Sequence, residues 1–119
     1  MSPRMQRVIN IVTVALSLIP LVWLACNLPS LPENVPVHFG SANIPDRWGS
    51  KYELLLIGIM APLVEGVCLA SQRFDFANLP ARFVTRAQRT NAVQRIAFVS
   101  VVLLDIAAFY VINLVLANL

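Results

Sequence analysis

The chain has 119 residues, of which 58% are hydrophobic and 13% charged, and it carries a formal net charge of +3. Such an apolar composition excludes an ordinary small soluble domain and is typical of a protein that lies in a lipid bilayer. Because the arginines flank apolar runs and do not alternate with aromatic residues, we expect no nucleic-acid partner.

The first apolar run, residues 8–28, has the length of about twenty residues that a transmembrane helix needs. Pro20 lies well inside this run and is expected to bend the helix, since proline removes one backbone hydrogen bond. Asn10, Thr13 and Ser17 recur at helical spacing and share one face. We therefore expect that face to contact protein and not lipid.

A polar, turn-rich loop at residues 29–53 follows and contains the single histidine of the chain, His38. Its prolines favour extended backbone. Alternation places Val35, Val37 and Phe39 on one side and His38 on the other. This pattern predicts a short strand-like segment that lies on an apolar surface.

Residues 31–51 of this loop read LPENVPVHFGSANIPDRWGSK. This motif resembles the domain of unknown function at the N-terminus of bacterial SdpI-like immunity proteins, whose first loop reads roughly LPxxVPxHFNxxGxPDRxGSK. Gly40 and Asn43 stand where that family has Asn and then Gly, and both residue types tolerate left-handed backbone. We also expect a positive φ at Gly49. The matching positions are Leu31, Pro32, Val35, Pro36, His38, Phe39, Pro45, Asp46, Arg47, Gly49, Ser50 and Lys51.

The resemblance implies kinship with membrane proteins that protect a producing cell from a secreted toxic peptide and in some cases signal its presence to a cytoplasmic regulator. The chain is similar to the N-terminal part of those proteins only. By this resemblance the loop binds an extracellular peptide or a membrane partner. The candidate binding residues are Pro36, His38, Asp46, Arg47, Trp48 and Lys51.

The second apolar run, residues 54–70, is at the short end for a transmembrane helix. Small residues that share one face let a neighbouring helix approach closely. That face also carries Glu65 and consists of Gly58, Ala61, Pro62 and Gly66.

A basic segment, residues 71–95, carries five arginines against one acid and precedes the third apolar run, residues 96–116. Pro80 suits a first helical turn, after which Arg82, Arg86 and Arg89 line one side of an amphipathic segment. Such a segment is expected on the anionic cytoplasmic surface of the membrane.

These runs predict an all-α integral membrane protein, a single domain of residues 1–119 with three transmembrane helices and an ordered loop between the first two. The excess of arginine in the N-terminal tail and in residues 71–95 predicts that both are cytoplasmic. The motif loop and the C-terminus are then extracytoplasmic, in the plasma membrane of a bacterium.

The titratable residues do not form a catalytic or metal-binding pattern. A zinc site needs about four ligands from one place, and one histidine with the loop carboxylates does not form that pattern. The sequence has no zinc-protease motif, activated nucleophile or glycine-rich phosphate loop. We therefore expect no metal, no cofactor and no enzymatic activity.

Two acids lie within the apolar runs, Glu65 and Asp105, and a charged group at mid-bilayer costs about 2.5 kcal/mol or more. Helical rise places both in the half of the membrane that holds the polar face of the first helix. This arrangement predicts a buried polar cluster of Asn10, Thr13, Ser17, Glu65 and Asp105.

Three classes of function remain open from the sequence. In the first, the outer loop recognises a toxic peptide, a second membrane protein or a second copy of the chain. In the second, the protein is a small transporter or proton-coupled subunit that uses Glu65 and Asp105. In the third, it is a structural subunit of a membrane complex.

The topology predicts that Ser41 faces the outside of the cell. Ser41→Cys, in a background from which Cys26 and Cys68 have been removed, should react with a membrane-impermeant maleimide on intact cells. Reaction only after permeabilisation would show that the orientation is inverted.

Overall fold

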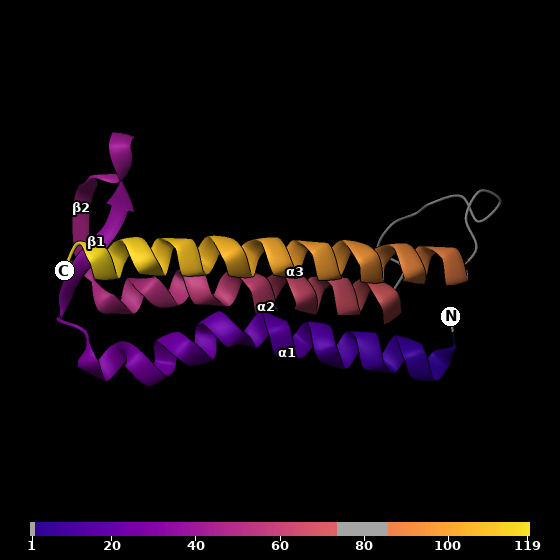
Figure 1. Ribbon diagram of the computed structural model, residues 1–119. Helices are drawn as coiled ribbons and strands as arrows, with labels where there is room; N and C mark the ends of the chain where they lie inside the picture. The colour runs from indigo at the N-terminus through magenta and orange to yellow at the C-terminus, as the bar shows by residue number, and fades with distance from the viewer. Residues whose placement is uncertain (1, 74–85) are drawn as a thin grey trace.

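The computed structural model describes residues 2–73 and 86–119 and has three long helices with a small β-hairpin at one end (Figure 1). The helices are α1 (Pro3–Asn27), α2 (Leu54–Arg73) and α3 (Arg86–Ala117). The hairpin, between α1 and α2, consists of β1 (Asn34–Phe39) and β2 (Pro45–Ser50), which are antiparallel. The N-terminus lies at the opposite end of the bundle from the hairpin and the C-terminus (Figure 1).

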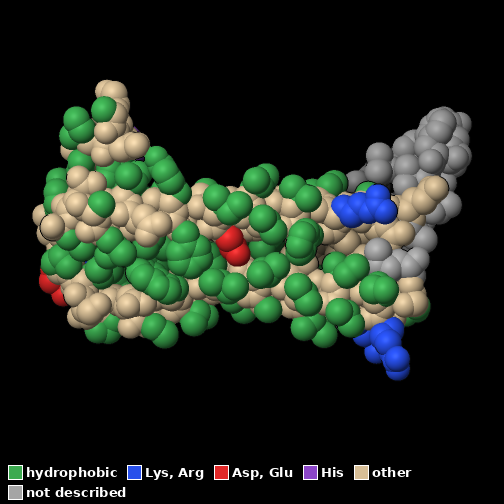
Figure 2. All heavy atoms as spheres, viewed as in Figure 1, with side chains coloured by type: hydrophobic (Ala, Val, Ile, Leu, Met, Phe, Trp, Pro, Cys, Tyr) green, Lys and Arg blue, Asp and Glu red, His purple; other side chains and the backbone are tan. Residues whose placement is uncertain are grey.

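The predicted fold class is confirmed, because α1, α2 and α3 are each long and apolar enough to cross a membrane. Apolar side chains cover the length of the bundle on the face seen in Figure 2. In lipid such side chains are well solvated, while the helices pair their own backbone N–H and C=O groups. The ordered segment between the first two helices is also confirmed, and it folds as the hairpin.

The helices extend beyond the apolar runs. α1 begins at Pro3, where Ser2 Oγ accepts a hydrogen bond from Met5 N at 3.2 Å. α2 continues to Arg73 and α3 begins at Arg86, so the two transmembrane helices extend into both ends of the basic segment 71–95 that was predicted to separate them. Hydropathy marks the part of a helix that lies in hydrocarbon, whereas Gln, Arg and Ala favour helix on either side of it.

The middle of the predicted basic segment, residues 74–85, lies outside the described residues. The predictions for Pro80 and Arg82 therefore remain predictions. The same holds for the side chains of Arg86 and Arg89.

A glycine contact joins α1 to α2. A Cβ atom at Gly58 would lie 2.9 Å from Leu24 Cδ1 and 3.1 Å from Leu21 Cα, so a larger residue would require Leu24 to move and the two helices to separate slightly. The predicted small-residue face is therefore correct at Gly58 and at Ala61, which is buried. It is wrong at Gly66, which is exposed and has no atom within 4 Å of an added Cβ.

The predicted strand is confirmed over β1. Val35 is fully buried, Val37 and Phe39 are half-buried and His38 is exposed. The second strand was not predicted, because the sequence of β2, PDRWGS, has no apolar alternation. β2 is a strand because its backbone pairs with β1, although its own side-chain pattern does not indicate a strand.

Gly58→Val should destabilise the bundle by about 1–3 kcal/mol, since the added atoms meet the backbone of α1 at Leu21. The matched control is Gly66→Val in the same helix, which should change stability by only about 0.5 kcal/mol. Thermal unfolding of both variants in detergent measures the difference. Equal melting temperatures would contradict the close approach of α1 and α2 at Gly58.

Candidate functional site

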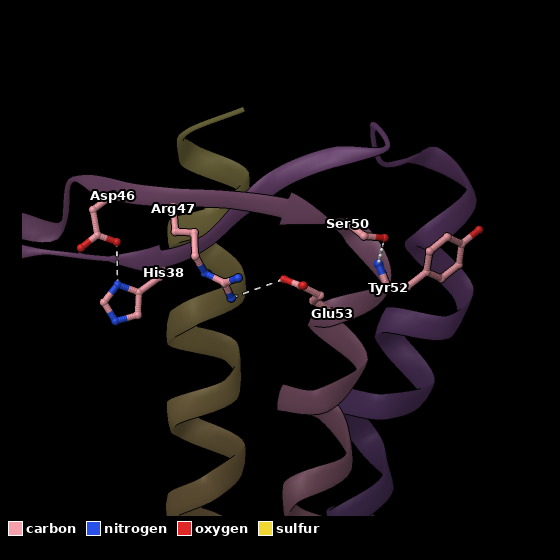
Figure 3. Close-up of polar contacts among 6 residues, drawn as sticks. All are labelled: His38, Asp46, Arg47, Ser50, Tyr52 and Glu53. Carbon is pink, nitrogen blue, oxygen red and sulfur yellow. Dashed lines mark hydrogen bonds and ion pairs between the residues drawn. The ribbon is translucent and has the colours of Figure 1, made fainter.

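The hairpin places His38 beside Asp46 through an irregularity in strand pairing. His38 pairs with Arg47 and Phe39 pairs with Pro45, so Asp46 is an extra residue on β2 between the two pairs. The His38 ring and the Asp46 carboxylate face each other, with Nδ1 and Oδ1 2.5 Å apart (Figure 3). Both side chains are well exposed, so water screens this contact and it adds little to stability.

The hairpin loop has left-handed backbone at Ala42 (φ 59°) and Asn43 (φ 58°). Gly40 N donates to Ile44 O across the loop at 2.8 Å. Asn43 Nδ2 donates to the hydroxyl of Tyr110 on α3 at 3.1 Å, which joins the loop to the bundle. Asn43 therefore has the turn geometry expected of it.

The expectation of a positive φ at Gly49 was wrong. Gly49 lies in an extended strand opposite Val35. Glycine suits this position because there is little space for a side chain. A Cβ atom there would lie 2.6 Å from Glu53 Oε2 and 3.3 Å from Val37 Cγ2. Glycine thus lets the first turn after β2 fold close against the strand.

Lys51 closes the base of the hairpin from a buried position. Its side chain is 7% exposed, and its Nζ donates to Leu31 O at 3.3 Å and lies 3.4 Å from Glu33 Oε1. Its backbone N donates to Glu33 O at 3.0 Å, which continues the pairing beyond the strands. A buried ammonium group requires such partners, so Lys51 holds the chain before β1 against the end of β2.

Four of the six residues predicted for binding are accessible to a partner. His38, Asp46, Arg47 and Trp48 are exposed, whereas Pro36 and Lys51 are buried. Burial gives those two a supporting role in the folded hairpin in place of the predicted contact with a ligand. They were indistinguishable in sequence because all six belong to one motif.

A second ion pair connects the hairpin to α2. Arg47 Nη2 lies 3.5 Å from Glu53 Oε2, just before the first turn of α2 (Figure 3). Ser50 Oγ accepts from Tyr52 N at 3.2 Å and caps the short 3₁₀ turn Lys51–Glu53 that leads into α2. These contacts help to set the direction in which the chain leaves β2 and enters α2.

The predicted polar cluster within the bundle does not form as one hydrogen-bonded group. The hydroxyls of Thr13 and Ser17 donate to backbone oxygens of their own helix, at 2.8 and 2.7 Å. Each bond uses the single donor of the hydroxyl within its own helix, so neither side chain can donate to a neighbouring helix. The remaining members, Asn10, Glu65 and Asp105, are not hydrogen-bonded to one another in the described part of the chain.

Asn10 instead belongs to an amide network that connects all three helices. Its Nδ2 donates to Gln72 Oε1 at 3.0 Å, and Gln94 Nε2 donates to Asn10 Oδ1 at 3.1 Å and to Gln6 O at 3.1 Å. Sequence reasoning missed Gln72 and Gln94, because both lie just outside the apolar runs and were assigned to a loop. The available signal was that Gln72 follows the second apolar run and Gln94 precedes the third, so that both lie at the same end of the bundle as Asn10.

Glu65 is 2% exposed in the middle of α2, and neither carboxylate oxygen has a hydrogen-bond partner among residues 2–73 and 86–119. Asp105 on α3 is half-buried, and its Oδ1 is also without a partner in that part of the chain. Unpaired carboxyl groups inside a membrane bundle are costly, so they mark a second candidate site.

Among residues 2–73 and 86–119, no group of three His, Cys, Asp or Glu side chains is close enough to hold a metal ion. Cys26 and Cys68 are both free thiols. The candidate sites of the described chain are therefore the exposed hairpin residues and the unpaired acids of the bundle.

The fold and its sites define a small multi-pass membrane protein whose α1 and α2 are joined by a docked β-hairpin. Residues 15–61 match the family described as Domain of unknown function (DUF1648). This stretch runs from the middle of α1 through the hairpin into α2.

An uncharacterized protein of Archaeoglobus fulgidus is 36% identical over 77 residues, which cover 56% of this chain and 42% of that protein. The chain thus spans less than half the length of this relative. No solved structure matches the chain.

Lys51→Met should weaken the hairpin by about 1.5–3 kcal/mol, since the bonds to Leu31 O and Glu33 are lost while the side-chain volume is kept. Limited proteolysis in detergent should then cut between β1 and β2 faster. Arg47→Met is the matched control, because it removes an exposed charge whose pair is worth at most about 1 kcal/mol. Equal cleavage of the two variants would remove the assigned role of Lys51.

Proposed function

We propose that the exposed side chains of the hairpin recognise a peptide or the extramembrane part of another membrane protein, without catalysis. The observation that carries this proposal is the extent of the family match. Residues 15–61 contain the hairpin and the segments of α1 and α2 on which it is docked, and the match ends before Glu65 and before α3. The shared part of the fold is thus the hairpin with its support.

The geometry supports recognition because the hairpin is docked on the bundle while several of its polar side chains are exposed. Val35 and Lys51 are buried and hold the hairpin in place, whereas His38, Arg47 and Trp48 are exposed. Rigid support of exposed polar and aromatic side chains is what a binding surface requires. The resemblance to SdpI-like immunity proteins makes a secreted toxic peptide the first candidate ligand.

The strands themselves provide a second means of binding. The sheet has two strands in the described part of the chain, so neither strand pairs with another strand on its outer edge. An extended peptide adds to such an edge through backbone hydrogen bonds, and the side chains of the edge strand select its sequence. Arg47 and Trp48 lie on β2 and would make that selection.

The alternative function is proton or solute movement through the bundle. It is supported by Glu65, whose buried oxygens are unpaired, and by Asp105. A carboxyl group that carries protons cannot be replaced by an amide of the same shape. The two proposals therefore predict opposite effects of mutation.

The test uses cells that lack the gene, exposed to spent culture medium of the parent strain, which contains its secreted peptides. The parent gene should restore survival, and His38→Ala with Arg47→Ala should reduce protection about tenfold, as the loss of an interface anchor does. Glu65→Gln with Asp105→Asn is the matched pair and should protect as the parent does. Membrane abundance is measured for each variant.

Loss of protection in the amide pair alone would refute recognition by the hairpin and support the transporter. Equal survival with and without the gene would exclude immunity. The transporter and the structural subunit of a membrane complex would then be the remaining classes.

A further inference from the structure

A groove between α1 and α3 lies at the end of the bundle opposite the hairpin. It has a volume of about 430 Å³ and is lined by Val8, Ile9 and Val12 of α1 and by Gln94, Arg95, Phe98 and Val99 of α3. This volume is in the range of about 300–1,000 Å³ that is typical of small-molecule sites. Val8, Val12, Phe98 and Val99 are each more than 40% exposed, so the groove opens toward the surrounding membrane.

The groove changes in polarity along its length. α1 and α3 both begin at this end (Figure 1), so Arg95 lies nearer the membrane surface than Phe98 and Val99, which follow one turn later. The groove is therefore cationic near the surface and apolar toward the bilayer centre. A phospholipid has the same division, with a phosphate at the surface and acyl chains below it.

A buried amide lies at the polar end of the groove. Gln94 is 3% exposed, and its Nε2 is used by Asn10 and Gln6, but its Oε1 has no hydrogen-bond partner in residues 2–73 and 86–119. An unsatisfied buried acceptor costs free energy unless a donor reaches it. A headgroup hydroxyl beside Arg95 would be a donor of that kind.

We propose that this groove binds one anionic phospholipid, with its phosphate on Arg95 and an acyl chain along Ile9, Val12, Phe98 and Val99. Basic pockets between transmembrane helices bind anionic headgroups through such contacts.

Local charge favours an anionic lipid over a zwitterionic one. Arg4, Arg7 and Arg95 are exposed at this end, and no acidic residue occurs in the described residues 2–12 or 86–99. Basic side chains are visible at this end of the molecule in Figure 2. Arg95 has no ion-pair partner within the described chain, so a phosphate would be its counter-ion.

The side chains of the groove also favour a lipid over a second helix. Close helix packing in membranes uses glycine, alanine and serine, whereas the apolar lining here is Val, Ile and Phe. A flexible acyl chain fits between such branched side chains, while a rigid helix is held away by them.

The experiment incubates the full chain in mild detergent with dioleoylphosphatidylglycerol or dioleoylphosphatidylcholine and measures retained lipid by native mass spectrometry. The parent should retain one phosphatidylglycerol in preference. Arg95→Gln should lower this retention about fivefold, because one basic side chain at an anionic surface contributes about 1 kcal/mol. Arg95→Lys should keep most of it.

Two controls separate the site from general effects. Arg4→Gln removes the same charge at the same end but outside the groove, and it should retain the lipid. Val99→Trp should fill the groove and displace the lipid, whereas Leu63→Trp, on an exposed position of α2, should not. Circular dichroism verifies that each variant is folded.

Equal loss in Arg4→Gln and Arg95→Gln would mean diffuse surface attraction and would overturn the site. Equal retention of the two lipids would overturn the role of Arg95. A dimer joined through Val99→Cys would show that a second copy occupies the groove instead.

Discussion

The fold depends on the burial of Val35, a side chain of the hairpin that packs against the bundle. It is fully buried in a core cluster to which every helix contributes, made of Leu24, Leu54, Ile112 and Val115. Burying one valine stabilises by about 1.5–3 kcal/mol, and an isolated two-stranded hairpin is only marginally stable. The hairpin is therefore ordered because it is docked, and in turn it covers apolar side chains where the three helices meet its base.

The sequence was sufficient for the parts of the fold that a periodic pattern specifies. Apolar runs of transmembrane length predicted the three helices, and the alternation around His38 predicted β1. β2 was missed because a strand can be specified by its partner instead of by its own residues. The helix ends were misplaced because hydropathy indicates which residues lie in the hydrocarbon layer and not where a helix ends. α2 continues through Gln72, and α3 begins before Gln94.

The candidate sites were predicted less completely, because burial and pairing depend on tertiary structure. Lysine is seldom buried, so nothing in the motif distinguished Lys51, which supports the hairpin, from Arg47, which is exposed. Similarly, Asn10, Thr13 and Ser17 share a helix face, but spacing does not say which of them bonds its own backbone. The amide partners of Asn10 come from the ends of two other helices.

Stability accounts for some of these polar residues and not for others. Lys51 is buried and paired, and the amides of Asn10, Gln72 and Gln94 bond one another across the helices, so each helps to hold the fold. The exposed pair of His38 and Asp46 contributes at most about 1 kcal/mol, and the unpaired carboxyl of Glu65 has an energetic cost in a membrane. Residues that folding does not require are expected at functional sites, where proteins depart from local rules. By that criterion the exposed pair and the buried acid are two places where function is expected, one on the exposed hairpin and the other inside the bundle.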